Sequence, residues 1–410
     1  MSLRSFIFLA MLVCFTQCKK EDIDSVSGIT DSVFFNVLIQ SGIDVNHDNK
    51  ISLQEAAAVK TIDAAGYGIM DLGGIEQFIN LDTLYCSSNQ LTRLNLSGNP
   101  NLKVLICYYN QLISLDVSHN PLLTTLACEG NKLTEMDISK NTELRYLYTG
   151  YNQLTSLDVS HNSDLNTLSC HNNELKTLQT ENKAKLEYLD CSYNRLTSLD
   201  ASGDLALENL YCDANELTEI DITDNPVLER FSCSQNKITS ITVSNTYNSK
   251  LSFLGCSYNP ITTLKLDNDS LFSLFCDHTS LTTLNLCGVK RLDWLNCSYN
   301  PITSLDLTGN AALTILDCTG DQLTNLDVSM NTGLLFLYCG GNQLTSLDIS
   351  KNLSIGLGES GGCGGGAYLD ISNMPTLEKV CVFRTPFPPI GFILNMEGSP
   401  NVYFSQDCSQ

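Results

Sequence analysis

The sequence predicts a β-rich solenoid of the α/β type, in which one short unit is repeated about thirteen times. Two observations predict it. Twelve cysteines recur at steps that are mostly 21 residues long, and Thr149 takes the equivalent position in the remaining unit. A fixed period of this size is typical of a solenoid, because each unit buries its apolar face only against its neighbours. The recurring cysteines are Cys86, Cys107, Cys128, Cys170, Cys191, Cys212, Cys233, Cys256, Cys276, Cys297, Cys318 and Cys339.

One unit reads Leu102-x-x-Leu105-x-Cys107-x-x-Asn110, followed by an alternating apolar block such as Leu115-Asp116-Val117. This pattern resembles the leucine-rich repeat in its short bacterial form, with cysteine where leucine normally closes the strand. The resemblance covers residues 81–352 and implies a right-handed superhelix. We expect each Leu-x-Cys segment to be a short strand whose Leu and Cys point inward and whose middle residue points outward. The second block should form an extended segment on the opposite wall.

An asparagine follows nearly every predicted strand, and only Thr279 and Asp321 interrupt the series. Its amide both donates and accepts, so a stack of asparagines can satisfy the backbone groups of sharp, buried turns. We therefore predict a structural role for these residues. The series is Asn89, Asn110, Asn131, Asn152, Asn173, Asn194, Asn215, Asn236, Asn259, Asn300 and Asn342.

The recurring cysteines could in principle form disulfides, hold metal ions or remain free. Parallel Cβ vectors on adjacent turns disfavour disulfides, which need Cβ atoms near 3.8 Å. Structural zinc sites use closely spaced Cys pairs, not residues a whole turn apart. We expect buried free thiols that act as small apolar side chains.

The first residues are expected to direct export. Arg4 precedes a short apolar run that ends at Phe15-Thr16-Gln17-Cys18, and this end resembles the lipobox of bacterial lipoproteins. The resemblance implies a signal peptide at 1–17, acylation of Cys18 and a lipidated tether at 18–30. The charged residues after Cys18 are similar to those of Gram-negative surface lipoproteins, which implies the cell surface or outer membrane. The alternative is an ordinary signal peptide and a secreted protein.

A twelve-residue segment from Asp44 to Glu55 resembles the EF-hand loop. Its oxygen-bearing side chains have the spacing that calcium, a hard cation, requires. The resemblance implies a structural calcium ion within a helical cap at 31–62, in which residues 53–62 form the helix that leaves the loop. The alternative is a vestigial loop. Lys50 would contribute its carbonyl and Glu55 both carboxylate oxygens. The implied ligands are Asp44, Asn46, Asp48, Lys50, Ser52 and Glu55.

Both ends of a solenoid need protection of their apolar and unpaired groups. Residues 63–80 form a degenerate first repeat, and residues 353–410 comprise interrupted last repeats and a C-terminal cap. Cys381 is out of phase with the inward positions and Cys408 lies near the terminus, so we predict a disulfide between them. Cys287 and Cys363 have no assigned role. An EF-hand-like cap before leucine-rich repeats resembles the architecture of bacterial internalins, which are surface adhesins.

Composition limits the possible functions. A formal charge of −22 disfavours nucleic acid and electrostatic docking on anionic lipid, so the predicted membrane contact is the lipid anchor alone. The five histidines match no nucleophile or metal-ligand spacing, and we expect no enzymatic activity and a monomeric protein.

Large aromatic side chains occupy predicted outward positions of the strands. Aromatics contribute strongly to recognition where they are exposed, although they also suit strands for structural reasons. We expect the concave face to bind a protein ligand in recognition or adhesion. The alternatives are a glycan-binding lipoprotein and a structural envelope protein without a specific ligand. The candidate binding residues are Tyr146, Tyr148, Tyr188, Tyr211, Phe253, Phe275, Trp294, Phe336 and Tyr338.

Overall fold

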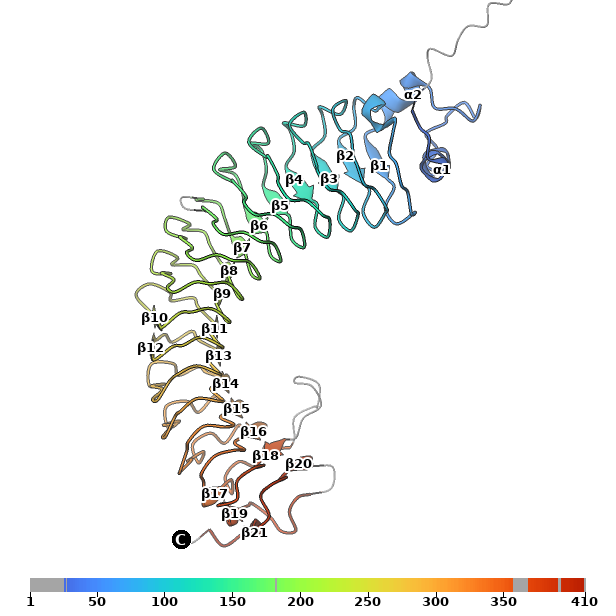
Figure 1. Cartoon of the computed structure of the whole chain (residues 1–410). Helices are drawn as coiled ribbons and strands as arrows, with labels where there is room; N and C mark the ends of the chain where they lie inside the picture. Colours follow the sequence, from blue (N-terminus) through green and yellow to red (C-terminus); the bar gives the residue numbers. More distant parts are fainter. Residues whose placement is uncertain (1–25, 27, 181–182, 357–367, 390–391, 409–410) are drawn as a thin grey trace, which may run out of the picture.

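The chain forms a curved solenoid whose strands line the inner side of the arc (Figure 1). The computed structural model describes residues 26, 28–180, 183–356, 368–389 and 392–408. Sixteen strands form one parallel sheet along the concave side, which confirms the predicted leucine-rich-repeat solenoid. Thirteen of them belong to the repeats at 81–352, and β1, β18 and β20 extend the sheet at its two ends.

The concave strands are short and follow the predicted Leu-x-Cys segments. In order they are β1 (Thr61–Asp63), β2 (Thr83–Tyr85), β3 (Val104–Ile106), β4 (Thr125–Ala127), β5 (Tyr146–Tyr148), β6 (Thr167–Ser169), β7 (Tyr188–Asp190), β8 (Asn209–Tyr211), β9 (Arg230–Ser232), β11 (Phe253–Gly255), β13 (Ser273–Phe275), β14 (Trp294–Asn296), β15 (Ile315–Asp317), β16 (Phe336–Tyr338), β18 (Leu369–Asp370) and β20 (Leu394–Asn395). The pairing register places equivalent residues of successive repeats side by side. Outward positions therefore form continuous columns across the sheet.

The opposite wall is extended, as the second apolar block predicts, and only part of it forms regular strands. A two-stranded sheet joins β10 (Ser240–Ser244) to β12 (Thr263–Asp267), and a three-stranded sheet contains β17 (Ser346–Asp348), β19 (Lys379–Cys381) and β21 (Tyr403–Ser405). Between the two walls, the repeat leucines and cysteines form one continuous buried core.

The ladder cysteines are buried free thiols in this structure. Several of them donate a weak hydrogen bond to the carbonyl oxygen of the next strand, as Cys191 Sγ does to Tyr211 at 3.5 Å. At the one position without cysteine, the Thr149 hydroxyl reaches the equivalent carbonyl of Ser169 at 3.5 Å. The position therefore favours a small side chain with a donor hydrogen, which leucine lacks.

The turn asparagines join each repeat to the one before it. Asn194 Nδ2 donates to the carbonyl oxygens of Cys170 and Cys191 at 3.1 and 3.0 Å, while its Oδ1 accepts from the Leu175 amide at 3.0 Å. Equivalent bonds recur along the series, and every member is buried. We call these residues the asparagine ladder. Their structural role is the one predicted from the sequence.

A second row of buried asparagines lies near the other wall. Asn120 Nδ2 donates to the carbonyls of Leu96 and Asn99 at 3.1 and 2.9 Å, and Asn141 repeats these bonds one turn later. These asparagines belong to the turns that follow the second apolar block of each repeat, as Asn120 does after Val117. Their burial follows from the need to satisfy the carbonyl groups of a second sharp corner.

The N-terminal cap contains α1 (Ser32–Gln40), α2 (Leu53–Ala58) and the short 3₁₀ helix η1 (Ile75–Gln77). Asp31 caps α1, and its second carboxylate oxygen accepts from the amides of Met70 and Asp71, which ties the helix to the first repeat. The expected leaving helix over residues 53–62 is too long. It ends at Ala58, because residues 61–63 already pair with β2 in the solenoid sheet.

The C-terminal cap is held by a disulfide between Cys381 on β19 and Cys408 after β21, with Cα atoms 5.5 Å apart. The two strands are neighbours on the convex wall. Cys381 is only 3% exposed. It is thus covered, although it lies out of phase with the core residues Val380 and Val382. Cys363 lies outside the described residues.

The asparagine ladder has two substitutions with different consequences. Thr279 Oγ donates to the Cys276 carbonyl at 3.2 Å and so replaces one bond of the amide. Asp321 accepts from the Asn300 amide at 2.7 Å. A carboxylate has no hydrogen to donate to the carbonyls that an asparagine reaches. Burial accordingly raises the pKa of Asp321 to about 8, so its neutral form is favoured.

Replacing Asp321 with asparagine should stabilise the protein increasingly as pH rises from 4 to 8. In this window the folded state keeps a proton that the unfolded carboxyl, with an ordinary pKa near 3.9, has released. The free energy of unfolding of the native chain therefore falls with rising pH, by at most about 1.4 kcal/mol per unit. Asp321→Asn removes this loss, which chemical denaturation at several pH values would measure.

The matched control is Asp327→Asn, at an aspartate whose pKa is lowered by hydrogen bonds from Ser329. It should show no pH-dependent gain between pH 4 and 8. Equal effects of the two substitutions would contradict the assignment to Asp321.

Candidate functional site

The candidate binding aromatics lie on the outward positions of the concave sheet, and most of them are half-buried. Tyr146 is the most exposed of them, at 41%. Register pairing aligns Phe253, Ser273, Trp294, Ile315 and Phe336 in one column. Tyr148, Tyr211, Phe275 and Tyr338 lie in the neighbouring outward column, two residues further along each strand.

The central aromatics contact one another across three neighbouring strands. Phe275 on β13 lies 5.6 Å from Phe253 and 4.8 Å from Trp294, as measured between ring centroids. On β9, the Arg230 guanidinium lies 4.4 Å above the Phe253 ring, and its Nε donates to the Tyr211 hydroxyl at 3.0 Å. We call Phe253, Phe275 and Trp294 the central stripe, and Arg230 connects this stripe to Tyr211 on β8.

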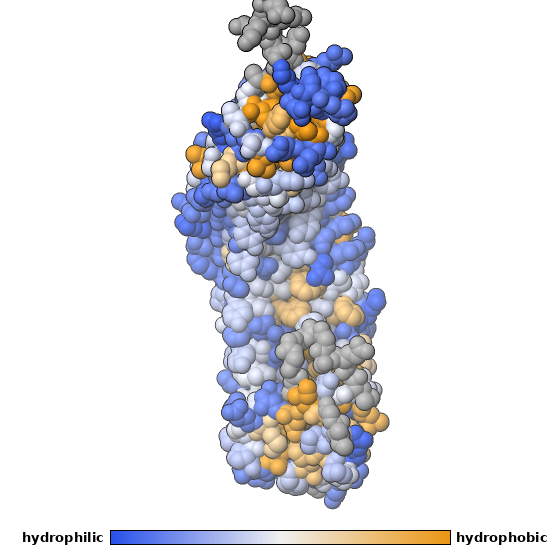
Figure 2. Space-filling model, turned by 90° about the vertical axis from the view of Figure 1, so that its right-hand side faces the viewer, coloured by the Kyte–Doolittle hydropathy of each residue, from blue (hydrophilic) through white to orange (hydrophobic). Residues whose placement is uncertain are grey.

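A second group lies at the C-terminal end of the sheet. Phe336 contacts Tyr338 and Tyr368, and Tyr368 in turn contacts Phe392. Tyr368 and Phe392 were not among the predicted residues, because the interrupted repeat hides their phase in the sequence. Figure 2 shows hydrophobic atoms at the N-terminal cap and along the C-terminal half of this side of the molecule, with a more polar stretch between them.

A row of tyrosines follows one rim of the sheet, at the residue before five of the ladder asparagines. These tyrosines are 51–60% exposed and adopt the left-handed backbone region at φ of 52–56°. They are Tyr109, Tyr151, Tyr193, Tyr258 and Tyr299. Their rings lie over the following turn, as Tyr258, His278 and Tyr299 do in one stack with centroids 4.2 and 4.5 Å apart.

The EF-hand-like loop at residues 44–55 joins the two cap helices α1 and α2. The Asp44 carboxylate accepts from the Asp48 and Asn49 amides, and Asp48 accepts from the Lys50 amide at 2.9 Å. Asn49, which stands where EF-hands have glycine, adopts a left-handed φ of 59°.

Both carboxylate oxygens of Glu55 accept hydrogen bonds from the protein, so Glu55 is not part of a preassembled calcium site. Its Oε1 accepts from the Val45 amide at 2.8 Å, and its Oε2 accepts from the amide and hydroxyl of Ser52 at 2.8 Å. The Asp44, Asp48 and Glu55 oxygens therefore do not all lie within 4.8 Å of one another; in the described part of the chain only Asp348, Cys381 and Cys408 do. The disulfide engages both of those sulfurs. The donor chemistry of the loop suits calcium, and Glu55 would have to turn to complete it.

The repeated aspartates of the convex wall have a structural role that the sequence did not indicate. Asp116 Oδ1 accepts from the Ser118 amide at 2.9 Å, and Asp137, Asp158 and Asp221 make the equivalent bond. Hydrogen bonds from the serine side chain and amide lower the pKa of Asp116. These residues shape the turns as well as providing surface charge.

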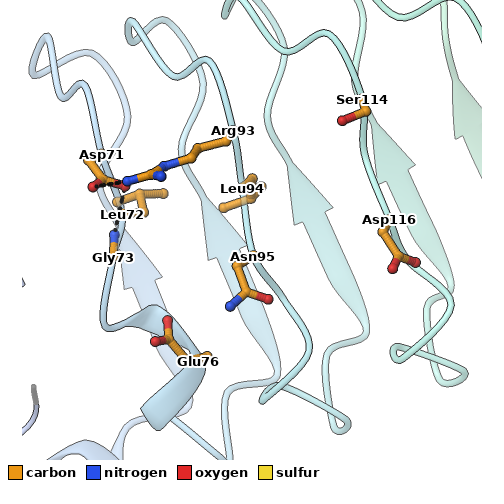
Figure 3. A pocket seen from close by; sticks show the side chains of 9 residues that line it. All are labelled: Asp71, Leu72, Gly73, Glu76, Arg93, Leu94, Asn95, Ser114 and Asp116. Carbon is orange, nitrogen blue, oxygen red and sulfur yellow. Dashed lines mark hydrogen bonds and ion pairs between the residues drawn. The ribbon is translucent and has the colours of Figure 1, made fainter. Parts of the chain in front are cut away.

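A hollow of about 340 Å³ lies on this wall near the N-terminal cap, and Figure 3 shows Arg93 reaching toward Asp71 within it. Their charged atoms are 2.9 Å apart, and Asp71 also accepts from the Gly73 amide at 3.1 Å. The arginine of this hollow is therefore already paired, and we assign the hollow no ligand.

The histidines of the repeats take part in surface contacts without the geometry of nucleophilic catalysis. His119 and His161 are exposed and contact the preceding serines. His278 contacts Asp277, which also accepts from Ser257. Because the carboxylate lies between the serine and the imidazole, His278 is not placed to take the serine proton.

The predicted lipidation residue Cys18 lies outside the described residues. Within the described ranges, no helix has both the length and the apolar character needed to span a bilayer.

Comparison with known proteins shows similarity at the level of fold and repeat sequence. The functional domain of InlJ from Listeria monocytogenes, which includes a cysteine ladder, is 33% identical, with 87% of this chain and 78% of that one covered and a TM-score of 0.74. An internalin, InlF of the same species, is 19% identical over 93% and 96%, with a TM-score of 0.56. The plant peptide hormone receptor RGFR1 in complex with RGF2 is 19% identical over 81% and 61%, with a TM-score of 0.62. No protein-family model and no curated protein matches the chain.

The burial of the ladder predicts strong protection of its thiols. Burial raises the pKa of Cys107 to about 12, and a buried, protonated thiol is unreactive. In the folded protein we expect a thiol-specific reagent to modify the exposed Cys287 rapidly and the ladder cysteines only after unfolding. Cys287→Ser should remove rapid modification of that site and leave ladder protection unchanged. Ladder cysteines that react as fast as Cys287, identified by mass spectrometry, would refute the buried arrangement.

Proposed function

The chain belongs to the internalin-like leucine-rich-repeat proteins, and on that premise we propose that its concave face binds a protein partner without catalysis. A leucine-rich-repeat solenoid of this kind is a scaffold for protein interaction. The observation that carries the proposal is the central stripe, where Phe253, Phe275 and Trp294 contact one another across neighbouring strands.

The energetic argument rests on aromatic burial at an interface. Half-buried rings that already pack together lose little conformational freedom on binding, and each can bury a large apolar area. Such anchors typically dominate the binding energy of protein interfaces. Adhesion to another cell is the role we favour for a surface solenoid with this face.

Substitution of the central stripe should therefore weaken partner binding strongly. Purified protein would be screened on arrays of extracellular proteins and of glycans. Phe275→Ala with Trp294→Ala should weaken a protein hit by at least about thirtyfold, because interface anchors contribute about 2 kcal/mol or more. The matched control is Tyr247→Ala, at an exposed aromatic after β10 on the convex wall.

Thermal unfolding of each variant establishes that the loss is not due to misfolding. A hit that survives the double substitution would contradict a role for the stripe. A stripe-dependent hit on glycans alone would favour the glycan-binding alternative, and no hit on either array would favour a structural envelope protein.

We also propose that the loop at residues 44–55 binds one structural calcium ion. Asp44, Asn46, Asp48, Ser52 and Glu55 supply hard oxygen donors at the required spacing, and Lys50 supplies a carbonyl. The ion would neutralise part of the charge of the three carboxylates and join the two cap helices.

Calcium should raise the thermal unfolding midpoint relative to the protein in chelator. Saturation at a hundredfold excess over Kd would contribute about 2.7 kcal/mol. Asp44→Ala should abolish the difference, whereas Asp63→Ala, at an exposed aspartate of β1, should retain it. Identical midpoints of the native chain in calcium and in chelator would reject the site.

Finally, we propose that acylated Cys18 anchors the protein to the surface or outer membrane of a Gram-negative bacterium. Cys18→Ser should move the protein from the detergent phase to the aqueous phase in detergent partitioning. Cys14→Ser, four residues earlier in the predicted signal peptide, should leave it in the detergent phase. Aqueous partitioning of the unmodified chain would instead support secretion.

A further inference from the structure

A second feature of the concave face lies beside the central stripe, where β7 and β8 meet the tyrosine rim. A hollow of about 340 Å³ is lined by residues of four successive turns. Its aromatic side chains are Tyr151, Tyr188, Tyr193 and Tyr211, and its carboxylates are Asp190 and Asp213. We call it the tyrosine–aspartate pocket.

The pocket carries negative charge that the protein leaves partly unpaired. Asp190 Oδ1 accepts from the Ser192 amide at 3.0 Å, and Asp213 Oδ1 accepts from the Ser232 hydroxyl and the Ser234 amide at 2.6 Å. The Ser234 side chain also hydrogen-bonds Asp213, and neither aspartate forms an ion pair with a lysine or arginine among the described residues. Burial raises the pKa of Asp213, and the nearby Asp190 charge raises it further. A cation would relieve this repulsion.

No lysine or arginine of the surrounding surface supplies that cation. Between Tyr85 and Gly341, neither residue type occurs in the outward column that contains Tyr148 and Tyr211. Neither occurs at the two positions after each ladder cysteine. The basic group of the pocket is His171, whose Nε2 lies 3.7 Å from the Glu129 carboxylate. The hydrogen bond to Glu129 raises the pKa of His171 most, and the charge of Asp190 raises it further, so the imidazole offsets only part of the negative charge of the pocket.

Arg230, just outside the pocket, shows how this face holds a guanidinium. It lies over the Phe253 ring and donates to the hydroxyl of Tyr211, a pocket residue. The Tyr211 ring lies 5.7 Å from Tyr188, so the pocket offers a second, neighbouring pair of aromatic rings. Unlike the Arg230 site, this pair has two carboxylates beside it, and no arginine or lysine among the described residues lies over it.

The chemistry that fits tyrosine faces beside carboxylates is a basic side chain. An arginine stacks its planar group on aromatic rings and donates two parallel hydrogen bonds to a carboxylate. Sugar hydroxyls also donate to carboxylates, but a neutral sugar carries no positive charge to offset the repulsion between Asp190 and Asp213.

We propose that the tyrosine–aspartate pocket receives an arginine side chain of the protein partner, an assignment that rests on the proposed protein-binding function. The partner therefore presents a basic residue next to an apolar patch. The basic residue enters the pocket, and the apolar patch covers the central stripe.

The test uses N-acetyl-arginine amide as the probe and N-acetyl-citrulline amide as its uncharged counterpart. Both are titrated into the mature chain with ¹³C-labelled tyrosine, and the Tyr188 and Tyr211 signals are assigned with Tyr→Phe variants. We expect arginine amide to shift both signals and citrulline amide to bind at least about tenfold more weakly, because a charge-assisted hydrogen bond contributes more than a neutral one.

Paired variants locate the site. Asp190→Asn with Asp213→Asn should weaken arginine binding by at least about tenfold. The matched control, Asp317→Asn with Asp370→Asn, removes the same charge from the sheet outside the pocket. The affinity of this control variant for arginine amide should stay within about twofold of the native value, because the contacts are local. Native-like thermal unfolding of each variant accompanies the titration.

Three results would overturn the proposal: equal binding of citrulline amide, equal loss in the control variant, or shifts with methyl glycosides but not with arginine amide. The titration measures arginine binding to the pocket in the absence of the protein partner. Arginine binding by a chain that captures no protein would reject the proposed function alone, whereas stripe-dependent protein capture without arginine binding would reject this inference alone.

Discussion

The asparagine ladder is the interaction on which the rest of the structure depends. A 21-residue unit cannot bury its own apolar face, and its sharp turns remove backbone groups from water. One amide per turn resolves both problems, because it accepts from the turn before and donates to the carbonyls of two successive turns. The small cysteine beside it keeps the turn close to its neighbour. Each repeat is thereby fixed in register with the next.

Register converts a repeated sequence into organised surfaces. Because equivalent residues lie side by side, variable positions become columns with distinct chemistry. One column collects the rings of Phe253 and Trp294, and the neighbouring one carries Asp190 and Tyr211. The left-handed turn residue places tyrosines along the rim. Recognition can vary freely at these positions without disturbing the buried ladder, which explains why scaffold and site are separable.

The period and phase of the cysteines were sufficient to predict the solenoid, the inward thiols and the outward aromatics. The sequence did not reveal the pocket at Asp190 and Asp213, because those residues belong to different repeats and meet only through register. Nor did it reveal the exposure of the rim tyrosines, which depends on a positive φ. The leaving helix was predicted too long, since strand pairing at Thr61 outweighs helical preference in that segment. Local patterns determine the unit, and contacts between units determine the site.

The most direct test of this account is amide hydrogen exchange of Asn194→Ala, compared with Asn209→Ala one turn later. The Asn194 side chain bonds to the Leu175 amide and the Cys170 carbonyl of the preceding turn. The Asn209 side chain, in contrast, makes no hydrogen bond to the described residues. We expect Asn194→Ala to accelerate exchange of the Leu175 amide and of the adjacent turns, with distant repeats unchanged, while Asn209→Ala leaves all of them protected. Unaltered protection around Leu175 in Asn194→Ala would contradict the central role of the ladder.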